Sequence, residues 1–353
     1  MLAMHLHSTI APASAKKLIR ITYVTVLFLS IISASASIGL LHTKEVAFSE
    51  SVKTIVDTVP SHEPFPVSVY PREKTIVENT KVDTYLNNSL SLQVQDTRSD
   101  KSSKEGWLRY IIAEFAALDW YQNLASPHSR ILIVRAGART EEVTKRFGDI
   151  LNWDAGERTT FSTLINDATP NLDEGTLFPA HYLVEKGATP ETVATILIDR
   201  FNTEILARYT QNVTSAVPLQ DALVIASMLE REAYDFTDMR EISGVIWNRL
   251  FIDMKLQIDA TLQYAKGTTH VSTWYPPVIP DDKYIDSPFN TYQNKGLPPQ
   301  PIGNPSTAAV LAALNPVQTE CLFYFHDLDS QFHCTPTYKE HVEQLKVYYG
   351  QGK

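Results

Sequence analysis

The hydrophobic pattern is clearest in the second half of the chain, where it predicts a helix that begins near Pro218. Ile225, Met228 and Leu229 recur at helical spacing and form one buried stripe. With about 100° turned per residue, Glu232 falls within roughly 20° of the centre of that stripe. The pattern therefore predicts a carboxyl group that points in the same direction as the core.

The two charged residues before it are predicted to point elsewhere. Glu230 lies roughly 150° from the stripe and Arg231 also lies off it, so both should be solvated on the outer face. Burial disfavours an ionised carboxyl group, so the pKa of Glu232 should rise towards the range of a general acid near neutral pH. The alternative is that Glu232 is a rim charge at the end of the helix.

A second helix is predicted to follow at once. Residues 238–241 read as a capping box, and the next apolar positions are Ile242, Val245 and Ile246. Arg249 lies at a core-facing step of this helix. It either contacts a carboxylate or a substrate carbonyl, or forms a structural pair.

Residues 256–261 alternate between apolar and polar side chains, which predicts an extended segment with one packed side. The other side presents Gln257, Asp259 and Thr261, whose donors and acceptors suit the hydroxyl and N-acetyl groups of a sugar. A half-buried structural strand gives the same pattern. The turn-rich loop after Asn290 and Tyr292 is predicted to form a rigid rim beside a cleft.

The preceding region alternates strand-like and helical patterns. Residues 131–134 read as a strand, Thr140 as the cap of the next helix, and residues 189–209 as a helix with proline at its first position. Residues 107–124 have a further helical period. Glu174 either lines a groove or caps a turn.

The amino-terminal part predicts export across a membrane. Residues 21–41 are uncharged and mostly apolar, about the length of a transmembrane helix. Lys16, Lys17 and Arg20 precede them, which should hold residues 1–20 in the cytoplasm and send the rest outwards. A signal peptide cleaved after Ala34-Ser-Ala36 is the alternative. Residues 42–105 are polar and read as a spacer or a degenerate module.

The composition of the chain narrows the classes of binding partner that we expect. The chain has 353 residues, a net charge of -9 and a pI near 5.6, which argues against nucleic-acid binding. Cys321 and Cys334 flank a predicted hairpin and either form a disulfide or pack as two thiols. Their spacing resembles no zinc motif, so neither a metal site nor a cofactor is predicted.

Four blocks of the sequence, in the same order, resemble the endolytic murein transglycosylase (YceG-like) family. They are Ile225–Glu232, Val245–Leu250, Leu256–Thr261 and Asn290–Ile302. The resemblance runs from about Ile131 to about His341. It implies an α+β protein with a single N-terminal transmembrane helix, an extracytoplasmic spacer, a small LysM-like βα module and a YceG-like catalytic domain. We expect the small module over residues 106–210 and the catalytic domain over residues 211–353.

The resemblance also implies an activity, that of an endolytic lytic transglycosylase of peptidoglycan. Glu232 would protonate the oxygen between N-acetylmuramic acid and N-acetylglucosamine, then accept a proton from the muramic acid C6 hydroxyl as a 1,6-anhydro ring closes. The implied substrate-binding residues are Gln257, Asp259, Thr261, Arg249, Asn290, Tyr292, Glu340 and His341. Implied partners are nascent glycan strands, the cell membrane as a single-pass anchor, and peptidoglycan synthases.

These expectations separate two hypotheses. For the enzyme, Glu232→Gln should stop cleavage while Glu230→Gln leaves it nearly unchanged. The alternative is a membrane-tethered peptidoglycan-binding scaffold without turnover. The sequence departs from the family pattern at Ala136, Ile258, Ala260 and Cys334, which is compatible with this alternative. A second carboxylate at Asp259 would instead make the protein a hydrolase that releases free reducing ends.

Overall fold

The computed structural model describes residues 63–77, 129–169, 172–267 and 273–350. The predicted membrane segment at 21–41, its flanking cations and the predicted helix at 107–124 lie outside these ranges. Among the residues that are described, none of the helices combines the length and apolar character needed to cross a bilayer.

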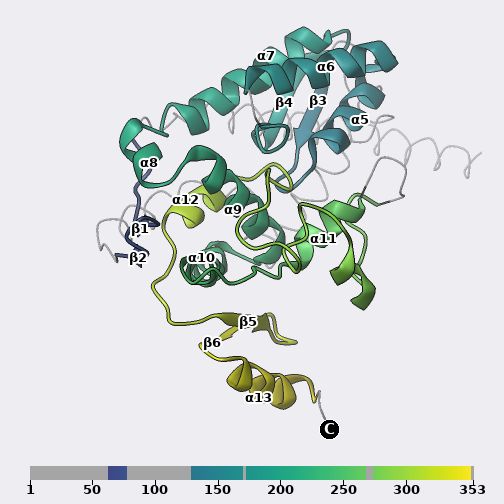
Figure 1. The fold of residues 1–353 in the computed structure, drawn as a ribbon. Coiled ribbons are helices and arrows are strands. Elements are labelled where there is room, and N and C mark those ends of the chain that lie inside the picture. Colours follow the sequence, from purple (N-terminus) through teal and green to yellow (C-terminus); the bar gives the residue numbers. More distant parts are fainter. Residues whose placement is uncertain (1–62, 78–128, 170–171, 268–272, 351–353) are drawn as a thin grey trace, which may run out of the picture.

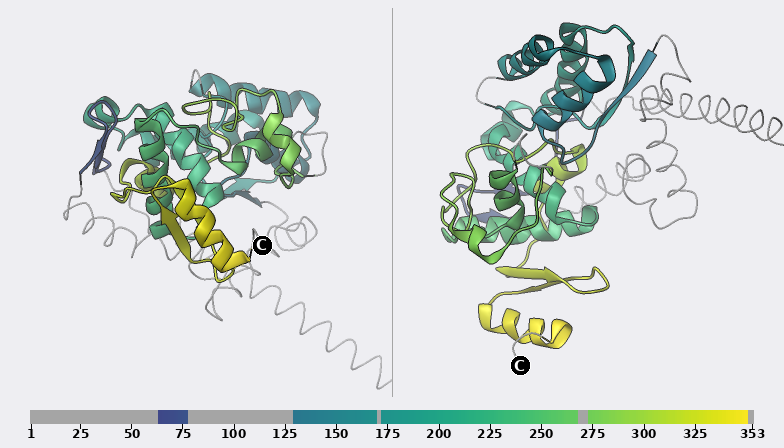
Figure 2. Two further views of the ribbon diagram at one scale, coloured as in Figure 1. Left: turned by 60° about the horizontal axis from the view of Figure 1, so that its bottom comes forward. Right: turned by 90° about the vertical axis from the view of Figure 1, so that its right-hand side faces the viewer.

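The described chain forms three tiers, seen one above the other in Figure 1. An upper lobe of two strands and three helices stands on a central lobe of helices, and a hairpin with one helix lies beneath. The right-hand view of Figure 2 shows the same three tiers from the side. The mixed α and β architecture is thus confirmed. The elements are β1 (Val69–Tyr70), β2 (Thr75–Ile76), β3 (Ser129–Val134), α5 (Thr140–Leu151), α6 (Ala155–Ala168), β4 (Ala180–Glu185), α7 (Pro190–Phe201), the π-helical turn η2 (Asn202–Leu206), α8 (Gln211–Ala216), α9 (Leu219–Glu232), α10 (Phe236–Phe251), α11 (Asp259–Lys266), the 3-10 turn η3 (Pro280–Tyr284), α12 (Thr307–Leu314), β5 (Phe323–His326), β6 (Phe332–Thr335) and α13 (Tyr338–Tyr349).

The upper lobe packs its helices on a two-stranded antiparallel sheet. In β3 every second side chain is buried, and the strand pairs with β4 in a register that places Leu132 opposite Tyr182. Phe147 of α5 and Phe161 of α6 pack in the same core, 6.1 Å apart between ring centroids. The strand and helix predicted at 131–151 are therefore confirmed, with Arg139 rather than Thr140 at the N-cap position. The helix predicted from Pro190 is also confirmed and continues as η2.

The central lobe encloses α9. Every residue of this helix from Ala222 to Glu230 is buried, because α10 and α12 pack against it from different sides. The approach of α10 to the chain after α12 is so close that a Cβ at Gly244 would lie 2.3 Å from the carbonyl oxygen of Val317. Glycine at position 244 is therefore a requirement of the packing.

The start of α10 differs from the predicted capping box. Its N-cap is Asp235, whose side chain accepts a hydrogen bond from the backbone N–H of Asp238. The Asp238 carboxylate does not cap the helix. It accepts a hydrogen bond from the N–H of Tyr234 at 2.8 Å and lies 2.9 Å from Nε2 of His326. The helix thus begins earlier than predicted, because the chain between α9 and α10 supplies its own cap.

The lowest tier is a hairpin stapled at its open end. β5 and β6 pair antiparallel with Tyr324 opposite Cys334, and Cys321 and Cys334 form a disulfide with an S–S distance of 2.06 Å. The predicted hairpin and the first of the two cysteine alternatives are confirmed. The helix α13 follows, with Thr337 and Glu340 forming its capping box.

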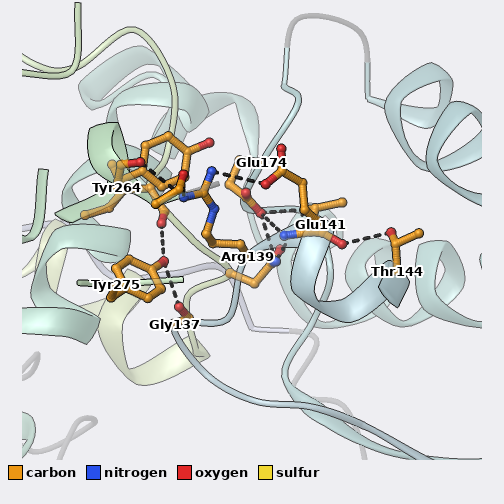
Figure 3. Close-up of polar contacts among 11 residues, drawn as sticks. Gly137, Arg139, Glu141, Thr144, Glu174, Tyr264 and Tyr275 are labelled. Atoms are coloured by element: carbon orange, nitrogen blue, oxygen red, sulfur yellow. Dashed lines mark hydrogen bonds and ion pairs between the residues drawn. The ribbon is translucent and has the colours of Figure 1, made fainter. Parts of the chain in front are cut away.

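A buried polar cluster joins the upper lobe to the central lobe, as Figure 3 shows. Oε1 of Glu174 accepts the backbone N–H of Thr140 at 2.8 Å, its hydroxyl at 2.5 Å, and the side-chain amide of Asn304 at 3.0 Å. Arg139 reaches across to donate to the carbonyl oxygens of Tyr264 and Gly267 at the end of α11. Of the two roles predicted for Glu174, the structure shows the capping one.

Stability should fall as pH rises because of Glu174. Burial raises the pKa of this carboxyl from 4.5 to about 7. Between these pH values the native state keeps a proton that the unfolded state has lost, so the free energy of unfolding decreases by about 3 kcal/mol across the window. Glu174→Gln keeps an acceptor oxygen and does not titrate. We expect urea unfolding from pH 4.5 to 7.5 to show a weaker pH dependence for this variant; an unchanged slope would contradict the assignment.

Loss of the disulfide should destabilise the protein. In Cys321→Ala/Cys334→Ala the unfolded chain regains the entropy of a short loop, and we expect a loss of about 2 to 3 kcal/mol in the free energy of unfolding. Urea denaturation with and without a reductant measures it. The reductant should lower the stability of the wild type and leave that of the double variant unchanged. Equal stability of the oxidised wild type and the variant would refute the prediction.

Candidate active site

Glu232 ends α9 and lies where three elements meet. The backbone N–H of Ala260, in the first turn of α11, points at its Oε1 at 3.4 Å. The hydroxyl of Tyr324, on β5, donates to its Oε2 at 3.2 Å. The side chain is half-buried. The carboxyl group is therefore held from two sides by groups that come from distant parts of the sequence.

The surroundings of Glu232 favour its protonated form. Burial raises the pKa of its carboxyl above the ordinary value, and the negative charge of Asp259 adds to the rise. The hydrogen bonds from Ala260 and Tyr324 and the nearby His326 act in the opposite direction and offset part of it. This carboxyl group therefore keeps its proton to a higher pH than an exposed glutamate does, and it can also exist as an anion.

The local sequence explains how the carboxyl is presented. α9 stops after Glu232 because Ala233 is extended, and the chain turns directly into α10. α11 begins at Asp259, so the amide of Ala260 has no partner within its own helix. Such an amide, at the positive end of the helix dipole, stabilises a carboxylate.

Two further buried glutamates have the same relation to a helix start. Glu174 accepts the first amide of α5 at 2.8 Å, and Glu230 accepts the amide of Ser306, the N-cap residue of α12, at 3.1 Å. Each also accepts a short hydroxyl bond, from Thr140 at 2.5 Å and from Ser306 at 2.7 Å. Glu232 has the longest amide contact of the three, at 3.4 Å. Its carboxyl is the least firmly engaged by the protein.

The prediction for Glu230 is wrong. This residue is 2% exposed, and its Oε2 accepts both the N–H and the hydroxyl of Ser306. The amphipathic pattern assumed one buried face, whereas α9 is enclosed on several sides and has little outer face at this point. Arg231 is exposed as predicted, with its guanidinium 3.8 Å from the ring centroid of Tyr275.

The prediction of an extended segment at 256–261 is also wrong. Gln257 has a φ of 51°, and the chain enters α11 two residues later. Consecutive residues of a helix are about 100° apart, so the alternation of a strand is lost and Thr261 is buried next to Ala260. Its hydroxyl donates to the carbonyl of Ile258 at 2.6 Å. Gln257 and Asp259 are exposed, so of the three predicted polar residues these two can reach a ligand.

Asn290 and Arg249 support the site instead of lining it. Asn290 is fully buried; its amide donates to the carbonyls of Lys283 and Ile285, and its oxygen accepts the N–H of Tyr292. Arg249 is buried as well. Its guanidinium donates to the carbonyl of Leu322 at 2.6 Å and to that of Leu256. The polar atoms of both side chains bond to the backbone, because the loops that they hold have few of the backbone hydrogen bonds of a helix or sheet.

Tyr292 and Asp259 form a pair beside Glu232. The Tyr292 hydroxyl donates to Oδ1 of Asp259 at 2.6 Å, and Lys283 lies 4.9 Å from the centroid of the Tyr292 ring. The structure thus brings together Glu232, Asp259 and Tyr292 from the predicted set.

Glu340 and His341 serve the C-terminal tier. Glu340 completes the cap of α13 with Thr337, and the His341 ring lies 5.7 Å from the rings of both Phe323 and Phe325. These contacts show a capping role for Glu340 and a packing role for His341. Their predicted binding of substrate stays a prediction.

The sequence interpretation missed Tyr324 and His326. They stand two positions apart on β5, so they belong to the same face of the strand, and His326 is bonded to Asp238 at the start of α10. A polar pair at this spacing within an aromatic strand was the available signal.

The fold and the site define an α+β protein with one half-buried carboxylic acid, placed between a helix start and a phenol. The chain belongs to the YceG-like family, since a model of that family matches residues 72–347. The crystal structure of a putative YceG-like protein from Listeria monocytogenes is similar, with a TM-score of 0.52 and 26% identity, covering 61% of this chain and 75% of that one.

Curated relatives are endolytic murein transglycosylases. The chain is 34% identical to the one from Bacillus subtilis over 176 residues, which is 50% of this chain and 48% of that protein. It is 31% identical to the one from Streptococcus pneumoniae over 155 residues, 44% of this chain and 28% of that protein. The matched part thus spans about half of the first relative and less of the second.

The pairing of Glu230 with Ser306 can be measured by a double-mutant cycle. Glu230→Gln replaces one acceptor oxygen with a donor, and we expect a loss of about 1 to 2 kcal/mol in the free energy of unfolding. Ser306→Ala removes the hydroxyl partner, and the double variant should be less destabilised than the sum by about 1 kcal/mol. Urea unfolding of the four proteins gives the coupling. Strictly additive losses would show that the bond contributes nothing.

Proposed function

We propose that the protein is a lytic transglycosylase that cleaves the glycan strands of murein internally. The observation that carries this proposal is the half-buried Glu232, whose pKa is raised by burial and whose two oxygens face the amide of Ala260 and the hydroxyl of Tyr324. General acid catalysis needs a group that is protonated at the working pH and can reionise within the cycle. Membership of the YceG-like family and the names of the curated relatives support the substrate class.

In the proposed reaction one carboxyl group serves twice. Protonated Glu232 donates its proton to the oxygen that bridges N-acetylmuramic acid and N-acetylglucosamine, and the bond from this oxygen to the anomeric carbon breaks. The C6 hydroxyl of the same muramic acid attacks the anomeric carbon, and its proton passes to the Glu232 carboxylate. The 1,6-anhydro ring is closed, the acid is restored, and no water is consumed.

Asp259 offers the route to a hydrolase. It is exposed and accepts a hydrogen bond from Tyr292, and its negative charge raises the pKa of Glu232. If it activated a water molecule or acted as a nucleophile, the products would carry free reducing ends. The chemical form of the new ends therefore separates the two reactions.

The location is also a proposal. We propose a single-pass anchor at residues 21–41 with the catalytic part outside the cell membrane, close to nascent strands and to peptidoglycan synthases. The pattern of apolar residues after Lys16, Lys17 and Arg20 supports it. The disulfide between Cys321 and Cys334 supports an oxidising compartment. We further propose that the upper lobe is the LysM-like module, since it combines two strands with helices.

The test of the catalytic assignment is Glu232→Gln. Gln is nearly isosteric but carries no transferable proton, so release of anhydro-muropeptides from purified sacculi should fall by at least about 100-fold. Product masses measured by mass spectrometry after a timed digest give the rate and identify the ends. Glu185→Gln, an exposed carboxylate at the end of β4 in the upper lobe, is the matched control and should keep full activity.

The outcomes separate the hypotheses. An active Glu232→Gln variant would overturn the role of Glu232. Free reducing ends from the wild type would identify a hydrolase. Binding of the wild type to sacculi without release of any product would identify a murein-binding scaffold.

A further inference from the structure

The second contact of the acid comes from a tyrosine that neither the family match nor the relatives assign. We propose that Tyr324 is a positioning residue that holds Glu232 in both of its protonation states during the reaction. The inference rests on the proposed function, because it concerns the acid and base steps of Glu232. The contact that motivates it is the hydroxyl of Tyr324 at 3.2 Å from Oε2.

The two oxygens of Glu232 are not equivalent. Oε1 faces the backbone N–H of Ala260, which can donate a hydrogen bond but cannot accept one. A proton on Oε1 would therefore weaken the only contact that this oxygen has to α11. The proton of the neutral acid belongs on Oε2, the oxygen that faces β5.

A tyrosine hydroxyl fits the demands at Oε2. It donates to the carboxylate, and after rotation about its C–O bond it accepts from the protonated acid. No heavy atom needs to move between the two arrangements. Burial and the neighbouring Glu232 charge keep the pKa of Tyr324 well above its ordinary value, so the hydroxyl stays neutral while Glu232 changes its charge. A lysine or an amide N–H in the same place could serve the anion alone.

The hairpin holds Tyr324 rigidly enough for this role. The ring is stacked on Phe332 with centroids 5.9 Å apart, and Tyr324 lies opposite Cys334 of the disulfide. Nearer the turn, His326 is bonded to Asp238 of α10. The strand is thus fixed on both sides of Tyr324, by a covalent bond at one end and an ionisable pair at the other.

Other charged groups also act on Glu232 and on its partner, and the test must separate their effects. Asp259 on α11 raises the pKa of Glu232, while His326 on β5 lowers it. The further titratable or charged groups on the elements packed around this site are Asp238 and Arg249 on α10 and Tyr292 on the loop before α12. Only Tyr324 among these groups donates a side-chain hydrogen bond to Glu232 in the described structure.

The experiment compares Tyr324→Phe with the wild type. The variant keeps the ring and removes the donor that stabilises the carboxylate, so the pKa of Glu232 should rise. Carbon-13 NMR of labelled glutamate, assigned with Glu232→Gln, follows this titration directly. In sacculus digestion we expect kcat to fall about tenfold with KM within about twofold, because the lost contact acts on the acid rather than on substrate binding. The limb where activity falls with rising pH should move to higher pH.

Two further variants make the result decisive. Tyr338→Phe removes a hydroxyl from the same tier, at a side chain that is 66% exposed, and should change neither the titration nor kcat. Replacing Tyr324 by 3-fluorotyrosine keeps the packing and makes the phenol a stronger donor, so the pKa of Glu232 should then fall. This second variant also tests the inference if Tyr324→Phe does not fold.

An unchanged Glu232 titration in both Tyr324 variants would overturn the inference, even if Glu232→Gln is inactive. A general loss of activity with an unmoved pH profile would show that Tyr324 is merely structural. If the wild type releases no anhydro products, the proposed function fails. The carboxyl titration would still report whether Tyr324 holds Glu232.

Discussion

The enclosure of α9 by α10 and α12 is the constraint on which the rest of the structure depends. Because the helix is buried over most of its circumference, any acidic residue near its end must find partners inside the protein or keep its proton. Glu230 finds them in Ser306, at the start of α12. Glu232, two residues later, finds weaker ones in Ala260 and Tyr324, and burial leaves its pKa raised.

Two other glutamates bind the start of a helix in the same way. Glu174 accepts the first amide of α5 and also bonds to Asn304 of the central lobe, and Glu230 of α9 accepts the amide of Ser306, the N-cap residue of α12. Both bond through a hydroxyl as well as an amide, so they contribute rigidity to the frame. The third glutamate, at α11, is held by a longer amide contact and by a phenol that can donate or accept. Small differences in otherwise similar contacts thus separate the two glutamates that support the frame from the half-buried Glu232.

The loops that support the site have no regular pattern. The loop after α11 is held by Asn290, and the junction between α10 and the hairpin by Arg249, both through bonds to backbone carbonyls. Polar side chains in such loops look like ligand-binding residues in a sequence, because buried loops and binding sites both need hydrogen-bonding groups. The structure separates the two uses through burial: Asn290 is enclosed, while Asp259 and Gln257 face solvent.

The sequence by itself determined the local elements: a helix from near Pro218 through Glu232, a second helix after Asp238, the strand at 131–134, the hairpin over 322–335, and Glu232 as the acid that leans towards the core. These follow from periodicity, which depends on neighbours along the chain. Tertiary structure alone decided that Glu230 is buried, that Thr261 faces inwards at the start of α11, and that Tyr324 lies against Glu232. Those facts depend on which elements pack on which side, and a period within one segment carries no information about its partners.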